Sequence, residues 1–405
     1  MKKTTFSNIT FKASHNSYGK EETSNEQLTF DTHAPYHCGC MALEFDIWRH
    51  SSTYEYLKEI DKNYFTVNHI GPGKTKLVHY LDEVLDWHKK NQHHPIILIT
   101  LDIKSSRGGC DFFHKEIDTY LKCYFDETII FKPNQLMTDE TLSLCENVIM
   151  NGWPDLSSSE LQGKFIFCLS GNKKWKSKYA ATNLHDRFCF SDEDISASDK
   201  EVSPPTKGNV VFFNFHISDH NKEVWMNTIP PFAEKNLITR IFVANTEADW
   251  NNCINANVSA IATDKINSTW AKVSDSCEYK IKKTTLDKRS LRNKSNKEYR
   301  TDHATKMQEK YESPACMFIF EKQNDATNVY AIRNAKNKEY LDSTITSMSK
   351  TITGPSQKWK LIEVDSKDSE YYVQNLENHE YLTKRASKLS KHAEKDEIYI
   401  INSVQ

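Results

Sequence analysis

The chain has 405 residues, of which 38% are hydrophobic and 27% are charged. This composition supports two or three domains with packed cores and excludes a disordered chain. The 53 Lys and Arg side chains are nearly matched by 55 Asp and Glu, which argues against a nucleic-acid-binding protein. No apolar run reaches the roughly 18 residues that cross a bilayer, so no transmembrane segment is expected.

The N-terminal two-thirds of the chain alternates strand and helix patterns. Short runs rich in β-branched and aromatic residues predict eight strands, at Ile9–Ala13, Ala42–Ile47, Phe65–His69, Ile96–Ile103, Phe165–Leu169, Val210–Phe215, Arg240–Ala244 and Ser259–Thr263. Amphipathic helices are expected between them, most clearly over Lys76–Lys90 and Asp111–Lys122. Several strands are apolar on consecutive positions, as in a parallel sheet that is covered on both faces. We therefore expect an α/β fold, a (β/α)8 TIM-like barrel, over residues 1–272.

The C-terminal third contains an internal repeat. The motif Asn-Lys-Glu-Tyr ends at Tyr299 and again at Tyr340, and Asn-His-Glu-Tyr ends at Tyr381, at a fixed spacing of 41 residues. Three further sets keep this period: Asn293, Asn334 and Asn375; Leu291, Ile332 and Val373; and Phe318, Trp359 and Ile400. A fixed period indicates repeated architecture, so three units of short strands predict a second, all-β domain over residues 275–405.

One unit of this repeat resembles the repeat of a known domain type. The segment that ends in Gln357-Lys-Trp359 resembles a repeat of the ricin-type β-trefoil, with its Gln-x-Trp ending. The resemblance implies a trefoil, lectin-like domain whose partners are glycans.

Polar side chains follow the first four predicted strands of the barrel. They are Ser14-His15-Asn16, Glu44-x-Asp46, Asn68-His69 and Asp102-x-Lys104, and His216 follows the sixth strand. The carboxyl ends of barrel strands meet at one mouth, where barrel enzymes carry their active sites. Residues two apart on a strand face the same side, so Glu44 and Asp46 should point together.

The residue types at this mouth indicate metal and acid–base chemistry. Glu44, Asp46, Asp102 and the amide oxygen of Asn16 form an all-oxygen set, which suits Ca²⁺, with Mg²⁺ as the alternative, better than zinc. His15 and His69 are then left for proton transfer. Lys104 and His216 are expected to contact the substrate. Each residue alone has a structural explanation, such as an ion pair, but four clusters on consecutive strands favour a site.

The order of these motifs resembles a known enzyme family. SHNSY, LEFDIW, VNH and PIILITLDIK, read in that order, resemble the catalytic barrel of metal-dependent phosphatidylinositol-specific phospholipases C. The resemblance implies that Asn16, Glu44, Asp46 and Asp102 bind Ca²⁺ and that His15 and His69 are catalytic. One departure is that Asp102 stands where relatives usually have Glu.

The resemblance also implies a mechanism. The family cleaves phosphatidylinositol to diacylglycerol and a cyclic inositol phosphate. Glu44 would accept the proton of the inositol 2-hydroxyl, His15 would stabilise the phosphorus centre, and His69 would protonate the leaving group.

Partners and compartment follow from the same interpretation. We expect a phospholipid membrane surface as the main partner. No apolar signal-peptide core follows Lys2 and Lys3, so we expect synthesis in the cytoplasm and action at a membrane, including outside the cell after non-classical release. Two alternatives stay open: a lectin or toxin built on an inactive barrel, and a phosphodiesterase for another lipid, such as a lysophospholipid or sphingomyelin.

Overall fold

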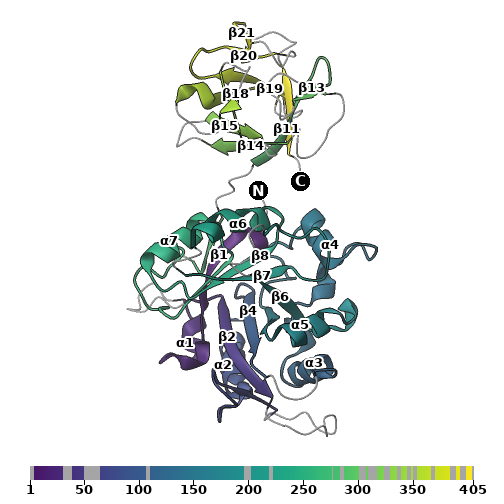
Figure 1. Ribbon diagram of the computed structural model, residues 1–405, viewed down its shortest axis with the longest axis vertical. Helices are drawn as coiled ribbons and strands as arrows, with labels where there is room; N and C mark the ends of the chain where they lie inside the picture. The colour runs from purple at the N-terminus through teal and green to yellow at the C-terminus, as the bar shows by residue number, and fades with distance from the viewer. Residues whose placement is uncertain are drawn as a thin grey trace. The chain divides into compact units, whose positions relative to one another are not determined.

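The chain forms two compact units, Met1–Lys282 and Lys283–Gln405, which we describe separately (Figure 1). In the first unit the computed structural model describes residues 4–30, 39–49, 64–105, 110–195, 202–218, 222–275 and 277–282. In the second it describes residues 287–300, 307–308, 317–322, 329–334, 339–343, 348–349, 354–365, 370–383, 389–392 and 398–403. No helix in these ranges is long and apolar enough to cross a membrane.

The first unit is a closed barrel of parallel strands. Within its described residues the ring has eight strands: β1 (Ile9–Ser14), β2 (Ala42–Arg49), β4 (Ile97–Ile103), β5 (Phe165–Gly171), β6 (Cys189–Ile195), β7 (Phe212–His216), β8 (Ile238–Phe242) and β9 (Ala260–Thr263). Ala13 of β1 pairs with Ala42 of β2, which closes the ring. This arrangement confirms the predicted (β/α)8 barrel.

Helices surround these strands (Figure 1). They are α1 (Ser24–Leu28), α2 (Leu77–Lys90), α3 (Phe113–Tyr124), α4 (Leu144–Asn151), α5 (Lys173–Ala180), α6 (Lys222–Glu234) and α7 (Glu247–Asn255). Their apolar faces form one core with the outward faces of the strands. On α2, for example, Leu77, Leu81 and Val84 are fully buried, at the helical spacing that the sequence predicted.

The predicted set of barrel strands needs two corrections, one strand to remove and one to add. The segment 65–69 is not a barrel strand: β3 (Phe65–Val67) pairs antiparallel with the far end of β2. The barrel strand that the sequence analysis missed is β6. Asp192, Glu193 and Asp194 are consecutive acidic residues, which the sequence pattern does not mark as a buried strand. Asp192 is nevertheless buried, and Lys176 of α5 pairs with it at 2.5 Å.

The boundary between the units also lies later than the predicted limits of 272 and 275. β10 (Tyr279–Ile281) pairs antiparallel with β1 and so belongs to the barrel. Lys282 follows it and is buried, and its Nζ donates hydrogen bonds to Ser7 O and Ser259 Oγ. The residues just before the repeat therefore complete the first unit.

The second unit has four strands in each 41-residue repeat, twelve in its described residues. Six of them form a closed antiparallel ring: β11 (Asp287–Asn293), β14 (Met317–Lys322), β15 (Val329–Asn334), β18 (Lys358–Asp365), β19 (Glu370–Asn375) and β22 (Tyr399–Ser403). Three hairpins complete it: β12 (Tyr299–Arg300) with β13 (Met307–Gln308), β16 (Tyr340–Leu341) with β17 (Met348–Ser349), and β20 (Tyr381–Leu382) with β21 (Leu389–Ser390). This threefold arrangement is a β-trefoil.

The core of the trefoil follows the predicted period with one exception. Leu291, Ile332 and Val373 are fully buried, as are Asn293, Asn334 and Asn375 at the ends of their strands. Phe318 and Trp359 are buried as well, and Trp359 Nε1 donates to Leu341 O at 3.0 Å. Ile400, the predicted third member of this set, is only half-buried, because its neighbours Tyr399 and Ile401 point into the core instead.

Candidate active site and metal centre

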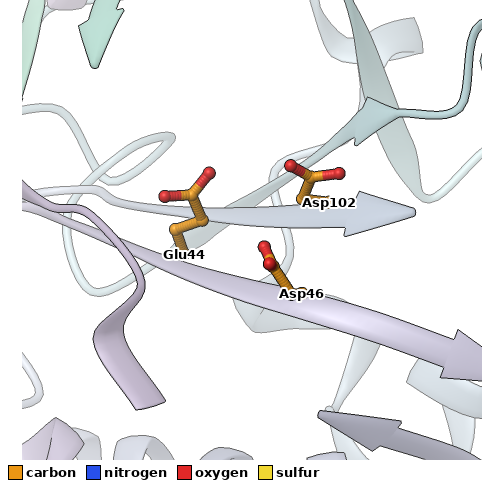
Figure 2. Close-up of side chains that lie close together, drawn as sticks. All are labelled: Glu44, Asp46 and Asp102. Atoms are coloured by element: carbon orange, nitrogen blue, oxygen red, sulfur yellow. The ribbon is translucent and has the colours of Figure 1, made fainter. Parts of the chain in front are cut away.

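Three carboxylates converge inside the barrel mouth. Glu44 and Asp46 lie on β2 and Asp102 lies on β4, where Asp46 and Asp102 are direct partners in the register of the two parallel strands. Figure 2 shows the three side chains pointing toward one another, as the i, i+2 spacing on β2 predicted. One oxygen from each of them lies within 4.8 Å of the others. Oxygens bound to one Ca²⁺ at about 2.3–2.6 Å would have separations of this size.

The surroundings of Asp102 fit a cation. Its Oδ1 is buried and has no hydrogen-bond partner among the described residues. A buried oxygen without a partner lowers the stability of the fold unless a positive group binds it. Gly171, at the end of β5, makes room for this oxygen: a Cβ there would lie only 2.0 Å from Asp102 Oδ1. Burial raises the pKa of Asp102, and the charge of Lys104 only partly offsets this effect. The donor set is all oxygen, so the residues present fit a hard cation.

Two basic side chains partly neutralise the negative charge of the three carboxylates. Lys104 Nζ lies 2.9 Å from Asp102 Oδ2 and 3.4 Å from Asp46 Oδ2. Burial by itself would lower the pKa of Lys104, but the two carboxylates outweigh it and the pKa is raised. On the other side, Arg240 of β8 places Nη2 2.9 Å from Glu44 Oε2 and donates through Nη1 to Asn214. Lys104, predicted to contact substrate, therefore faces the carboxylates in this structure.

Asn16 reaches the same cluster from the loop after β1. Its backbone is left-handed (φ 49°), and its N–H donates to Glu44 Oε2 at 3.1 Å. The Tyr18 hydroxyl donates toward Asn16 Oδ1 at 3.1 Å and Asp46 Oδ2 at 2.9 Å. Burial and the charge of Asp46 raise the pKa of Tyr18 well above its ordinary value, so the hydroxyl stays protonated. The structure thus brings all four predicted metal ligands together.

His15 is held by an acid that the sequence analysis did not single out. Its Nδ1 lies 2.8 Å from Asp264 Oδ1, and its Nε2 lies 3.9 Å from Glu44 Oε2. Asp264 also accepts hydrogen bonds from Asn245 at 2.7 Å and Lys20 at 3.2 Å. Partial burial works to raise the pKa of Asp264, but the bonds from His15 and Asn245 and the charge of Lys20 outweigh it and hold the pKa well below the usual range.

His69 reaches the site from outside the barrel ring. It follows β3, and its Nδ1 lies 2.8 Å from Asp46 Oδ2, while 63% of its side chain is exposed. His69 therefore lies beside the carboxylates, as predicted, but it follows a strand outside the barrel ring instead of a barrel strand. His15 and His69 are therefore each anchored through Nδ1 to a different carboxylate.

His216 ends β7 on the same rim as His15. Its ring centroid lies 5.0 Å from that of Phe242, and the Phe242 ring also lies 6.0 Å from the ring of His15. Its substrate-binding role remains a prediction.

The site also contains residues that the sequence analysis missed. Asp264 directly follows the strand Ser259–Thr263, so the rule that marked Asp102 as a strand-end carboxylate could have found it. The role of Arg240 could not be predicted in this way, because a charged residue at the start of a predicted strand is usually exposed to solvent.

Comparison with known proteins bears on the fold of the barrel unit. The family model for Ca²⁺-dependent phosphoinositide phospholipase C matches residues 59–209. Two solved structures of a calcium-dependent phosphoinositol-specific phospholipase C from Pseudomonas sp., one of them a myoinositol complex, are 20% identical to this chain. They cover 69% of it and 95% and 96% of their own chains, with a TM-score of 0.51. No curated protein matches the chain.

A smaller part of the chain is similar to a lectin. The structure of SeviL bound to asialo-GM1 saccharide is 20% identical and covers 30% of this chain and 100% of its own, with a TM-score of 0.25.

The barrel fold, the match to the family model and the similarity to the Pseudomonas structures confirm the resemblance to Ca²⁺-dependent phosphoinositide phospholipases C.

Proposed function

We propose that the chain is a Ca²⁺-dependent phosphodiesterase that cleaves phosphatidylinositol-type lipids to diacylglycerol and a cyclic inositol phosphate. One observation carries the proposal: two histidines, each anchored to a carboxylate, flank a three-carboxylate cluster at the mouth of a barrel. The substrate class is supported by the description of the matching family model.

The cation would be held by Glu44, Asp46 and Asp102, with Asn16 as the fourth protein ligand. When bound, Ca²⁺ supplies positive charge that stabilises the developing negative charge at phosphate and favours ionisation of the attacking hydroxyl.

His15 is the proton acceptor that the geometry supports best. With its Nδ1–H donated to Asp264, Nε2 carries the lone pair and can take the proton of the inositol 2-hydroxyl. Glu44, the acceptor expected from the sequence, already accepts from the Asn16 N–H and pairs with Arg240. We therefore assign proton acceptance to His15, positioned by Asp264, and assign Glu44 to binding the cation.

His69 is suited to protonate the leaving group. The 2-oxygen forms a new bond to phosphorus, and the bond between phosphorus and the diacylglycerol oxygen breaks. His69, as an imidazolium stabilised by Asp46, gives its proton to that oxygen. Most of the His69 side chain is exposed, so it faces the direction from which a lipid would approach. The cyclic phosphate is then opened slowly by water in the reverse proton sequence.

We propose that the trefoil acts on location rather than chemistry. The four clusters of the site all lie in the first unit, and the second unit has the closed fold of lectin-like domains. Attachment to a glycan would raise the effective concentration of the enzyme at its membrane. A role as a toxin, acting at the outer surface of a target cell, fits this combination of units.

A panel of lipid headgroups tests the proposal. The full chain is incubated with phosphatidylinositol, phosphatidylcholine, sphingomyelin and a lysophospholipid, each with Ca²⁺, with Mg²⁺ and with a chelator. We expect phosphatidylinositol to be cleaved fastest, and only with Ca²⁺. Cleavage of another headgroup would replace the substrate assignment, and absence of any turnover would favour a lectin on an inactive barrel.

A further inference from the structure

His69 lies outside the barrel ring, so its position in the site depends on something other than the barrel itself. Its side chain is 63% exposed, and its imidazole is hydrogen-bonded through Nδ1 to Asp46. An imidazole that the core does not enclose takes its position mainly from its own main chain. The contacts that hold this main chain therefore decide where His69 can deliver a proton.

The residue before His69 is hydrogen-bonded to β2 through both of its main-chain groups. The Asn68 N–H donates to Asp46 O at 3.0 Å, and the Asn68 carbonyl accepts from Trp48 Nε1 at 2.7 Å. On the other side of His69, the side-chain amide of Asn68 donates to Ile70 O at 2.7 Å. The main chain of His69 is thus held between two fixed points, and Trp48 ties them to β2.

Trp48 is placed to act on His69 together with Asp46. The two residues are two apart on β2, so their side chains project to the same face of the strand. One strand therefore carries the carboxylate that bonds the imidazole and the indole that holds the chain beside it. Trp48 is only half-buried, so its ring is not a fully enclosed part of the core.

The strand pair that carries these contacts extends beyond the barrel ring. Residues 47–49 of β2 pair with β3, and we name this pair, with residues 68–69, the β2–β3 arm. An isolated pair of strands is at best marginally stable, so the arm needs an anchor. Arg49 supplies one: its Nε lies 3.2 Å from Glu116 Oε2 of α3, and its guanidinium lies 4.6 Å from the ring centroid of Trp175 of α5.

The anchor is an ion pair in the protein interior. The side chains of Arg49 and Glu116 are 3% and 1% exposed. A buried ion pair contributes little net stability compared with apolar side chains of similar volume, whereas its contacts are directional. Stability alone therefore does not account for a charged pair at this place.

We propose that the β2–β3 arm positions His69 for proton transfer, and that Trp48 is the positioning residue that sets its main chain. The Arg49–Glu116 pair fixes the arm on α3. This inference rests on the proposed function, because it concerns the proton that His69 gives to the diacylglycerol oxygen. A displacement of a catalytic group by about 1 Å can lower a rate by about 10²-fold, so small shifts of the arm matter.

Two inositol phosphodiesters with different leaving groups test the role of Trp48. A short-chain, soluble phosphatidylinositol releases an alkoxide that needs a proton, whereas 4-nitrophenyl inositol phosphate releases a phenolate that departs without one. Trp48→Phe keeps an aromatic ring and removes the Nε1–H donor. Its kcat on phosphatidylinositol should fall about 10- to 10²-fold with an unchanged KM, while its kcat on the nitrophenyl substrate stays at the wild-type value.

The matched control is Trp153→Phe. It removes an indole N–H that donates to a main-chain carbonyl elsewhere in the barrel unit, Asn236 O at 2.9 Å, and it should keep the wild-type ratio of the two rates. An equal fall of kcat on both substrates in Trp48→Phe would show a general structural defect and overturn the inference. Wild-type kcat on both substrates would overturn it as well.

A double variant tests the anchor. Arg49→Met combined with Glu116→Met removes both charges, so neither is left buried without its partner. We expect a melting temperature at or above that of wild type and the same selective loss of kcat on phosphatidylinositol. Wild-type kcat on phosphatidylinositol in this variant would overturn the role of the anchor.

A measurement without turnover separates this inference from the proposed activity. The ¹⁵N resonances of the His69 imidazole, identified by their loss in His69→Ala, report whether Nδ1 is hydrogen-bonded. The bond should be present in wild type and Trp153→Phe and lost in Trp48→Phe. If it is lost while no headgroup is cleaved, the positioning by Trp48 stands and the proposed activity falls. If phosphatidylinositol is cleaved while Trp48→Phe keeps this bond and the wild-type kcat, the activity stands and the positioning falls.

Discussion

Lys104 occupies the position where it must compete with a bound cation. Its ammonium lies 2.9 Å from Asp102 Oδ2 and 3.4 Å from Asp46 Oδ2, and both residues are proposed metal ligands. A cation that binds these oxygens has to displace Lys104, so part of its binding free energy is spent on breaking these contacts. Lys104→Met removes the competitor and keeps most of the side-chain volume. We therefore expect this variant to bind Ca²⁺ more tightly than wild type.

The size of the effect follows from the contacts. A hydrogen bond to a charged group contributes about 1.5–3 kcal/mol, and the lower end applies here because 26% of the Lys104 side chain is exposed. About 1.4 kcal/mol corresponds to a tenfold change in affinity, so the dissociation constant for Ca²⁺ should fall about 10-fold. Without Ca²⁺ the variant should melt at a lower temperature than wild type, because the carboxylates lose a counter-charge. Saturating Ca²⁺ should raise the melting temperature of the variant by more than it raises that of wild type.

Titration calorimetry of chelator-treated protein measures this affinity directly. The matched control is Lys89→Met, which removes an equally short but exposed contact, 2.8 Å to Asp86, far from the cluster. The control should bind Ca²⁺ as wild type does. Unchanged or weaker Ca²⁺ binding by Lys104→Met would refute the placement of the cation among these carboxylates.

Three further predictions concern the histidines, a buried lysine and the domain boundary. His15→Ala and His69→Ala should each lower kcat on the best phosphodiester by about 10²- to 10⁴-fold with an unchanged melting temperature, and near-normal turnover in either would refute its role. Burial lowers the pKa of Lys282 from 10.5 to about 7, so between these pH values the unfolded chain binds the extra proton and stability rises with pH. Urea unfolding at pH 7 and 9 should show this rise, at most about 1.4 kcal/mol per pH unit, in wild type and not in Lys282→Met. Finally, a chain that ends at Lys282 should unfold cooperatively and cleave a short-chain soluble substrate at the full-length rate. A chain that ends at Trp270 lacks β10 and should lose cooperative unfolding. Equal behaviour of the two shortened chains would contradict the boundary after Lys282.

The carboxylate cluster could be predicted because the positions of its members follow from the local geometry of neighbouring strands. Glu44 and Asp46 share a strand face through the period of two, and Asp102 ends the neighbouring strand, so strand-end reasoning was enough to bring them together. The 41-residue period likewise located all three repeats of the trefoil, since each repeat contributes the same four strands.

The errors have physical causes in long-range pairing. β6 was missed because two of its acidic residues, Asp192 and Asp194, are paired with Lys176, a partner that no local pattern reveals. The segment 65–69 has strand character and forms a strand, but pattern alone cannot tell whether a strand joins the ring or pairs outside it. Asp264 and His15 are separated by 249 residues, so their hydrogen bond becomes visible only when the barrel closes.

The identity of the product tests the central claim most directly. Phosphatidylinositol in mixed micelles is incubated with the full chain and Ca²⁺, and the phosphorus-containing products are followed by ³¹P nuclear magnetic resonance. We predict that a five-membered cyclic inositol phosphate appears first, is converted slowly to the monoester, and does not form when a chelator is present. Direct release of the monoester without a cyclic intermediate, or the same turnover with the chelator, would contradict the proposed chemistry of His15, His69 and the carboxylate cluster.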